Sequence, residues 1–557
     1  MSEHSEEFLA NTATSLFRAI QSPTGPLPKE LREKLQSLPR PIRKKVVETK
    51  QIGFTALASA CIVGNTEIME YLVKECDANI EQKCIDSQLE SYTPLRWVCV
   101  SGNYDVLKHL IRLGADAKAL SDCGSTLVLL ACRQRDHRIV RYLVRKGADV
   151  RKTNNNGETC LIAWIKTCMN KFDNRKKGTI KLLLKHGADP FVYFNGDDAL
   201  KIACRSANYQ LAFYLINILD YTPERKADAY ELVGATLFFK FGSYSLTIFC
   251  WRQAHDRRLV GGNYRQKRPE ISPHTIYGNT REFRTLAELE EIMEDPDAIG
   301  LQGLLICERV LGTDDKDTLS QMTRHGHHYQ LTDRIQKCID LWMLVLQRQI
   351  QKYTILDSDS SSIAQKMVGR ARNSIPPRFE YVWSVFQLLA SDAIKTQPMI
   401  RTRKQQRNYD WTIRYIVYLM DVLLYMTKND QKREMIKKSI RELVCNNIRC
   451  VKTGETLLHL SIEHRIEGPG DVTKLLLECG AHIDLPDLTG VRPSELLAQK
   501  SWNDIPVNRF ISLKCYCANT IVGKGIPYGG RLPPVMENFV REHEWQRTNH
   551  KTVRKHN

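Results

Sequence analysis

The residues that could perform chemistry in this chain do not assemble into a catalytic motif. His325, His327 and His328 form a dense group of potential metal ligands, but no carboxylate or cysteine ligand pattern stands beside them. Zinc sites combine three or four ligands at characteristic spacings, so we favour a solvated helix end over a metal site. The chain also lacks a phosphate-binding loop, a GxSxG nucleophile turn and an HExxH helix. We therefore predict a protein that is not an enzyme and uses neither cofactor nor metal.

A second group of residues, toward the end of the sequence, is spaced for binding. Leu513, Cys517 and Ile521 are four residues apart, so on an α-helix they form one narrow apolar stripe with a small residue at its centre. After a Gly-rich break, Pro533 and Pro534 can begin a second helix. Either a partner supplies the core that these short helices lack, or they are the last helical pair of the preceding domain. The apolar positions of the second helix are Leu532, Met536, Phe539 and Val540.

Length and composition indicate a globular chain of three to four domains. Its 557 residues are 42% hydrophobic, which is enough for sizeable cores. The first residues are acidic, and no run of about 18 apolar residues occurs, so we expect neither a signal peptide nor a membrane segment. The 17 cysteines are scattered singly and form no CxxC pair, as in reduced proteins. We expect a cytoplasmic location, with the nucleus as an alternative.

The net charge of +18 raises the question of a nucleic-acid partner. Lysine and arginine are spread over every segment, however, and the densest clusters, at 401–404 and 547–555, lack the interleaved aromatic residues of a base-stacking surface. We favour a solvated basic face. A nucleic-acid binder remains a third class of function, which rests on net charge alone.

Threonine residues recur with the period of ankyrin repeats. Thr93, Thr126 and Thr159 are each 33 residues apart, and Gly-Ala-Asp closes successive units from Gly114 and Gly147 onward. We expect each threonine to cap the first helix of its unit, and each Gly-Ala-Asp to turn the chain into the next finger. Two irregularities, which we expect to form loops, are extra residues at 85–90 and a Lys-rich insert at 171–177.

A different spacing follows the ankyrin units. Gly326, Tyr329, Cys338, Trp342 and Val345 match the tetratricopeptide pattern of small and aromatic residues, which predicts helical hairpins. We interpret residues 357–362 as a polar linker before further helices, and ankyrin character returns at Gly454. The predicted fold class is all-α. It comprises an ankyrin-repeat solenoid, tetratricopeptide-like helical hairpins, a second short ankyrin segment and C-terminal docking helices. The predicted segments are a helical cap (1–45), ankyrin repeats (46–220), tetratricopeptide-like module (221–350), linker and helices (351–450), C-terminal ankyrin repeats (451–504), docking helices (505–545) and basic tail (546–557).

This order of modules resembles the fem-one (feminization) family of ankyrin proteins. The resemblance is strongest at residues 277–282, 305–312, 472–481 and 512–515. Within it, Ser-Leu-x-x-x-Cys-x-x-x-Ile from Ser512 resembles an elongin-binding box, and Leu-Pro-x-x-Met-x-x-Phe-Val from Leu532 resembles a cullin-2 box. The resemblance implies a substrate receptor of a cullin-2 RING ubiquitin ligase that recognises a degron at the C-terminus of its targets.

The resemblance also implies partners and contact residues. The partners would be an elongin B/C heterodimer, cullin-2 with its RING subunit, and substrate proteins through their C-termini; a homodimer stays open. Elongin would be bound by Leu513, Cys517 and Ile521, and cullin by Leu532, Pro533, Met536 and Phe539. The degron would be bound by Asp86, Arg96, Trp97, Ser101, Arg133 and Gln134.

The degron residues depart from the family pattern. Two Phe-Asp pairs of the family are here Ile85-Asp86 and Arg133-Gln134, so we expect a changed degron preference. Trp97 could be either an aromatic platform for a peptide or a core residue. The alternative to a ligase receptor is an ankyrin scaffold without ligase assembly.

Overall fold

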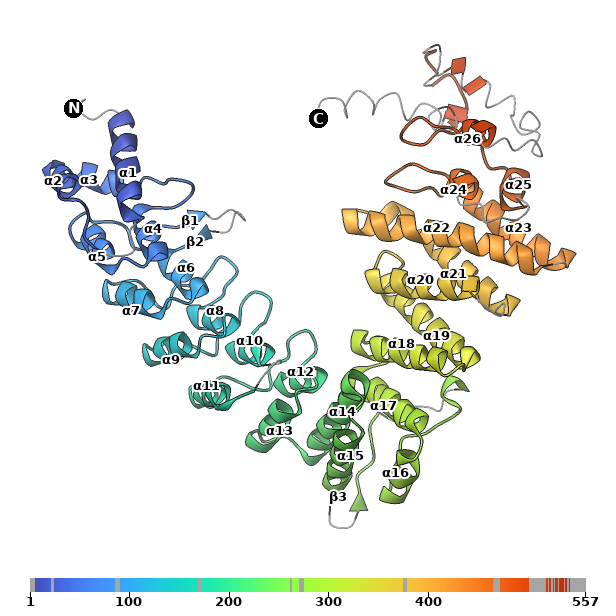
Figure 1. The fold of residues 1–557 in the computed structure, drawn as a ribbon, viewed down its shortest axis with the longest axis horizontal. Coiled ribbons are helices and arrows are strands. Elements are labelled where there is room, and N and C mark those ends of the chain that lie inside the picture. The colour runs from blue at the N-terminus through green and yellow to red at the C-terminus, as the bar shows by residue number, and fades with distance from the viewer. Residues whose placement is uncertain are drawn as a thin grey trace. The chain divides into compact units, whose positions relative to one another are not determined.

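The computed structural model consists of two compact units, and in the residues that it describes the regular structure is helical apart from two short strand pairs (Figure 1). Unit 1 comprises residues 1–270 and 282–306, and unit 2 comprises residues 271–281 and 307–557. The predicted all-α class is confirmed. The residues that the structure describes are 6–21, 25–85, 91–168, 172–260, 263–269, 275–373, 378–427, 429–463, 471–499, 517–518, 520–521, 524, 526–528, 530–534, 536–537 and 540.

Three short helices precede the repeats. The third of them begins between two prolines, with Pro39 at the N-cap of α3 and Pro41 within its first turn. Pro41 is tolerated in the first turn because its missing N–H would have no helical partner at that position. α1 and α3 pack against each other and against α4, the first helix of the ankyrin array. The three helices are α1 (Glu6–Ile20), α2 (Lys29–Ser37) and α3 (Arg40–Glu48).

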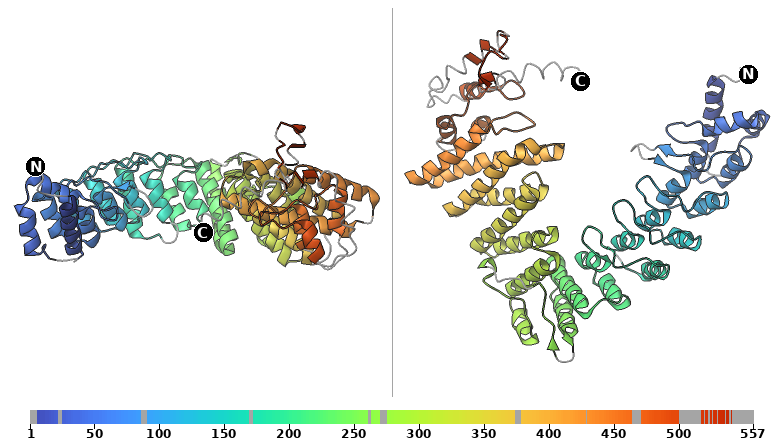
Figure 2. Two further views of the ribbon diagram at one scale, coloured as in Figure 1. Left: turned by 90° about the horizontal axis from the view of Figure 1, so that it is seen from above. Right: turned by 180° about the vertical axis from the view of Figure 1, so that it is seen from behind.

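The ankyrin array has an inner and an outer layer of helices, which appear as two rows in Figure 1 and, from behind, in Figure 2. Each inner helix packs against the next, and the connecting fingers project beside the inner row. The inner helices are α4 (Ala56–Val63), α6 (Pro94–Ser101), α8 (Leu127–Arg133), α10 (Cys160–Thr167) and α12 (Ala199–Arg205). The outer helices are α5 (Thr66–Lys74), α7 (Tyr104–Arg112), α9 (His137–Arg145), α11 (Asn174–Lys185) and α13 (Tyr209–Ile218). One finger carries the antiparallel pair β1 (Cys84–Ile85) and β2 (Ser91–Tyr92).

The predicted threonine caps are present in the repeats. The hydroxyl oxygens of Thr93, Thr126 and Thr159 accept the backbone N–H of the residue three positions on, at 3.4, 3.2 and 3.1 Å. Each bond satisfies an amide that the first turn of a helix would otherwise leave without a partner. Gly114 and Gly147 adopt φ values of 106° and 83°, which side chains with a Cβ rarely tolerate, so these glycines make the turn into the next finger.

The Lys-rich insert is not wholly a loop. Lys171 lies outside the described residues, but α11 begins at Asn174, so most of the remaining insert forms the first turn of an outer helix. Asp173 caps the start of this helix, because its carboxylate accepts the backbone N–H of Lys176 at 3.0 Å.

The predicted helical hairpins are present, with the same contact in each unit. In unit 1, an added Cβ on Gly234 would lie 2.6 Å from the indole nitrogen of Trp251; in unit 2, Gly326 packs in the same way against Trp342. Glycine is therefore required for the close approach of the two helices. The unit 1 elements are α14 (Pro223–Phe241), α15 (Tyr244–Arg258), β3 (Leu259–Val260), β4 (Asn263–Tyr264) and α16 (Leu286–Met293). α17 (Pro296–Leu311) contains residues of both units, and the unit 2 hairpin is α18 (Lys316–Leu331) with α19 (Ile335–Tyr353).

The rest of unit 2 corrects the linker interpretation of residues 357–362. Ser358 begins α20, Ser360 is buried, and the Asp357 carboxylate accepts the backbone N–H of Asp359 at 2.9 Å. The aspartate thus caps a helix that composition alone had suggested was a linker. The remaining elements are η1 (Thr275–Tyr277), α20 (Ser358–Asn373), α21 (Phe379–Thr396), η2 (Gln397–Met399), α22 (Arg403–Met426), α23 (Asp430–Cys445), α24 (Leu457–Glu463), α25 (Asp471–Glu478) and α26 (Pro493–Gln499).

Candidate peptide-binding groove

The inner helices of unit 1 carry the residues that we assigned to the degron. Arg96 and Trp97 lie on α6, which ends at Ser101, whereas Arg133 ends α8 and Gln134 follows it. Ser101, Arg133 and Gln134 are exposed. Asp86 lies outside the described residues. The structure thus places the other five residues on two neighbouring inner helices or directly after them.

Arg96 and Trp97 belong to an aromatic cluster near the start of the row of inner helices. The Arg96 side chain is buried, with its guanidinium 5.1 Å from the centre of the Tyr92 ring. Trp97 is half-buried and meets Phe54 and Tyr92 edge to face, at centroid distances of 5.4 and 6.1 Å. Trp97 therefore packs within the protein and also keeps part of its surface open.

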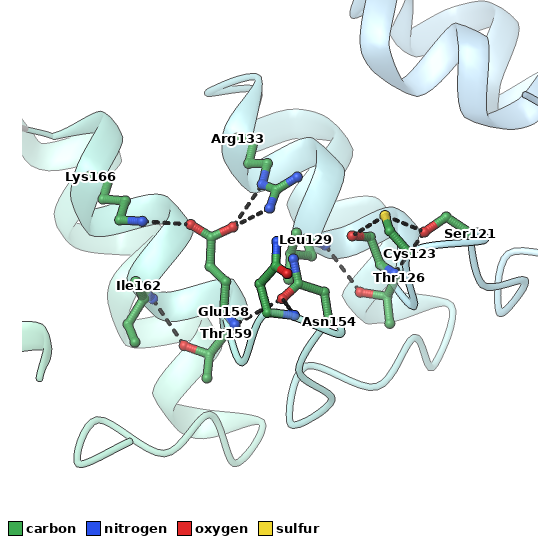
Figure 3. Close-up of polar contacts among 12 residues, drawn as sticks. Ser121, Cys123, Thr126, Leu129, Arg133, Asn154, Glu158, Thr159, Ile162 and Lys166 are labelled. Atoms are coloured by element: carbon green, nitrogen blue, oxygen red, sulfur yellow. Dashed lines mark hydrogen bonds and ion pairs between the residues drawn. The ribbon is translucent and has the colours of Figure 1, made fainter. Parts of the chain in front are cut away.

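Arg133 lies in a charged cluster that sequence reasoning missed (Figure 3). Glu158, only 5% exposed, accepts hydrogen bonds from Arg133 Nε at 2.8 Å and Lys166 Nζ at 2.9 Å. Burial would raise the pKa of Glu158, but the hydrogen bonds from Lys166 and Arg133 outweigh it and hold that pKa below its usual value. One carboxylate thus forms ion pairs with two cations, which come from the neighbouring inner helices α8 and α10.

The finger before α10 fixes the position of Glu158. The side-chain oxygen of Asn154 accepts the backbone N–H groups of Asn156 and Glu158, at 3.1 and 2.9 Å (Figure 3). The backbone N–H of Asn155 donates to the carbonyl of Cys123 in the preceding finger at 3.1 Å. The carboxylate is therefore held on a finger that is tied to its neighbour. The only signal in the sequence was the Gly157-Glu158-Thr159 tripeptide that opens the repeat.

The next finger repeats this arrangement of charges. Asp197 pairs with Arg205 at 2.7 Å and with Lys201 at 3.1 Å. Asp198 caps α12 through the backbone N–H of Lys201 at 2.7 Å and pairs with Arg225 at 2.9 Å. Finger carboxylates and inner-helix cations thus alternate along the array, and cations outnumber acids in the Glu158 and Asp197 clusters.

The fingers also carry exposed apolar side chains. Leu120 and Tyr193, in two different fingers, are among the exposed large hydrophobic residues, and the Lys166 ammonium lies 3.8 Å from the centre of the Phe194 ring. A floor of alternating charges beside apolar fingers offers an extended peptide both charge-assisted hydrogen bonds and apolar contacts. Peptide binding is the chemistry that this surface can perform.

The histidine group is only in part the solvated helix end that we favoured, because His327 and His328 are exposed but His325 is not. His325 is buried within α18 and contacts the rings of His328 and Tyr329, at centroid distances of 5.9 and 4.5 Å. Across the described part of the chain, no group of three His, Cys, Asp or Glu side chains could hold a metal ion. Nor does any helix in that part combine the length and apolarity needed to cross a bilayer.

The docking residues near the end of the sequence are described in part. Cys517 is exposed and Ile521 half-buried, both in helical conformation, whereas Ala518 between them is 1% exposed. Leu513 and Phe539 lie outside the described residues. In the second box, Pro533 is exposed, and Leu532 and Met536 are half-buried.

Comparisons with known proteins agree with this fold. The family described as "Ankyrin repeats (3 copies)" matches residues 31–121, 95–173 and 128–226. Protein fem-1 homolog A of Danio rerio is 23% identical over 379 residues, 58% of this chain and 61% of the relative. The human protein of that name is 24% identical over 380 residues (58% and 56%), and Drosophila melanogaster fem-1 homolog CG6966 is 32% identical over 165 residues (30% and 24%).

The chain thus spans about three fifths of the length of the fem-1 homolog A proteins that it matches. The matches confirm the resemblance that the motifs predicted. The chain is thus similar to the fem-1 proteins, and its helical repeats make it an ankyrin-repeat protein of the kind that serves protein interaction.

Proposed function

We propose that this protein is the substrate-recognition subunit of a cullin-2 RING ubiquitin ligase. It would bind C-terminal degrons of target proteins and present them for ubiquitination and proteasomal degradation. The observation that carries the proposal is the exposure of Cys517 beside the buried Ala518. The centre of the predicted elongin stripe faces solvent while its neighbour faces the chain, as a docking helix requires.

The receptor itself makes and breaks no bonds. It holds a substrate lysine near a ubiquitin-charged E2 enzyme, so its contribution is proximity and effective concentration. The groove of unit 1 supports this role, because a C-terminal carboxylate needs cationic or N–H donors. Arg133 and Lys166 are such donors, and their side chains are 39% and 35% exposed.

The direct test is purification of a Leu513→Arg variant from cells with its partners. An arginine at the contact would be buried without a counter-charge, which costs roughly several kcal/mol, so elongin should be lost. Leu331→Arg is the matched control, because Leu331 is 75% exposed on α18 and should keep elongin. Wild-type yields of elongin with Leu513→Arg would refute the docking assignment.

A second experiment separates the two boxes. Replacement of Leu532, Pro533 and Phe539 by alanine should keep elongin and remove cullin-2, because the Gly-rich break makes the second helix an independent contact. Equal loss of both partners would show instead that residues 505–545 form one folding unit. Retention of substrate with no elongin or cullin in any preparation would favour the scaffold without ligase assembly.

A further inference from the structure

Helix α22 carries large exposed aromatic side chains at both ends of one face. Its 24 residues pack against α20, α21, α23, α24 and α25. On the open face, Trp411 is 52% exposed and Tyr425 is 87% exposed. Tyr415, Tyr418 and Val422 lie between them and are half-buried. The rings of Trp411 and Tyr415 stack with a centroid distance of 6.3 Å, so the open face begins with an ordered aromatic pair.

The spacing of these side chains fits a second helix. The steps from Trp411 to Tyr425 are four, three, four and three residues, which is the pattern of the seam between two packed helices. Scattered exposed hydrophobic residues are common, but a continuous seam of this kind is not. Trp, Tyr and Arg are also the residues that dominate binding energy at protein interfaces. We call residues 411, 415, 418, 422 and 425 the aromatic seam.

Positive charge continues the aromatic seam toward the start of α22. Arg403, Lys404 and Arg407 are exposed, and Lys404 and Arg407 precede Trp411 by seven and four residues, on the same face. The first turn of α22 contains no acidic residue. Within the described residues, no carboxylate pairs with these three cations, whereas Arg414, one turn further, is held by Glu455 at 2.6 Å. A partner that covers the seam would therefore meet cations at one end only.

We propose that the aromatic seam docks an amphipathic helix of a partner protein, with acidic residues where that helix passes Arg403, Lys404 and Arg407. The apolar side of the partner helix packs between the rings, and its carboxylates pair with the cations. A single-stranded nucleic acid fits this face less well. Base stacking needs cations that follow the rings along the strand, whereas those of α22 gather before the first ring.

The probes are synthetic helical peptides of about three heptads, with leucine along one seam. One carries glutamates at a single end, and a second has lysines in their place. Titration of the full-length protein should show tighter binding of the glutamate peptide by about tenfold or more. Trp411→Ser and Tyr425→Ser should each weaken its binding by about tenfold, while Phe241→Ser, at a 68% exposed apolar residue of unit 1, should not.

Charge reversal gives the second arm. Lys404→Glu with Arg407→Glu should invert the preference toward the lysine peptide, a result that misfolding would not produce. Circular dichroism checks that each variant keeps its helices. Equal affinity for the two peptides, or binding that survives loss of both Trp411 and Tyr425, would overturn the proposal. So would binding of a labelled single-stranded oligonucleotide in place of either peptide.

Discussion

The two ankyrin segments contain the same tripeptide and use its acid differently. Glu158 and Glu455 each stand between a glycine and a capping threonine and are 5% and 7% exposed. Glu158 serves two cations from the inner helices of unit 1, on the groove side of the array. Glu455 serves Arg414 of α22 at 2.6 Å and the hydroxyl of Thr453 at 2.7 Å. The same local motif thus builds a cluster of charges between inner helices in one segment and a contact to the preceding helix in the other.

A second difference lies three residues after the threonine. Ile162 of the first segment is apolar and buried, whereas His459 of the second is hydrogen-bonded through both ring nitrogens. The backbone N–H of Thr456 donates to Nδ1 at 3.2 Å, and Nε2 lies 3.0 Å from the carbonyl of Val491. A neutral imidazole with its proton on Nε2 satisfies both bonds. The second segment therefore depends on a titratable side chain for a link that joins two of its fingers.

The largest expected effect concerns the degron selectivity that we propose for the first segment. Gln134 and the engaged Arg133 stand where the family would place an acid, so a terminal arginine should lose a charge-assisted bond. That loss is worth roughly 1.5–3 kcal/mol, about ten- to a hundredfold in affinity. A randomised C-terminal peptide library should show a requirement for a free carboxylate and weak preference for arginine.

The matched variant for this prediction is Gln134→Asp. Gln134 is exposed, so an aspartate there adds an acid without disturbing Glu158. The preference for terminal arginine should rise by about tenfold. Strong enrichment of terminal arginine by the wild-type protein, or indifference to C-terminal amidation, would contradict the prediction.

The next effect compares the two buried glutamates. Glu158→Gln removes the charge that two cations share, and we expect a loss of about 1–3 kcal/mol in the free energy of unfolding. Glu455→Gln removes the partner of a single cation and should cost about 1 kcal/mol. Urea unfolding of both variants tests the order. A larger loss for Glu455→Gln would show that the contact to α22 matters more than the groove cluster.

Sequence patterns predicted the features that depend on contacts between residues close together in the sequence. Threonine caps reach only three residues along the chain, and the Gly326–Trp342 contact follows from the hairpin spacing, so both could be predicted. Glu158 could not be assigned, because one of its cations lies 25 residues earlier, in the preceding repeat. The aromatic seam was hidden for another reason. The apolar run at 413–420 mixes buried and open positions of α22, which only the packing of its neighbours separates.

A smaller effect is expected from pH on the stability of the second ankyrin segment. Burial lowers the pKa of His459 in the folded protein below its ordinary value of 6.5. Folding therefore disfavours the protonated form, so the stability that this residue contributes is present above about pH 6.5 and is lost as pH falls below it. The protection of the α24 amides against hydrogen exchange, measured relative to the intrinsic exchange rate at each pH, should fall between pH 7 and about pH 5.5 in the wild-type protein. His459→Leu should flatten this dependence, and an unchanged pH profile in that variant would exclude His459 as its source.

The smallest effect is expected at an exposed finger acid. Asp122 and Lys83 join two neighbouring fingers at 2.6 Å, but their side chains are 68% and 54% exposed. The hydrogen bond from Lys83 lowers the pKa of Asp122, yet water and salt screen this pair where they do not screen Glu158. Asp122→Asn should therefore leave the unfolding midpoint unchanged within error at physiological salt. If it destabilised the protein as much as Glu158→Gln does, burial would not be what distinguishes the groove cluster, and the contrast between buried and exposed finger acids would fail.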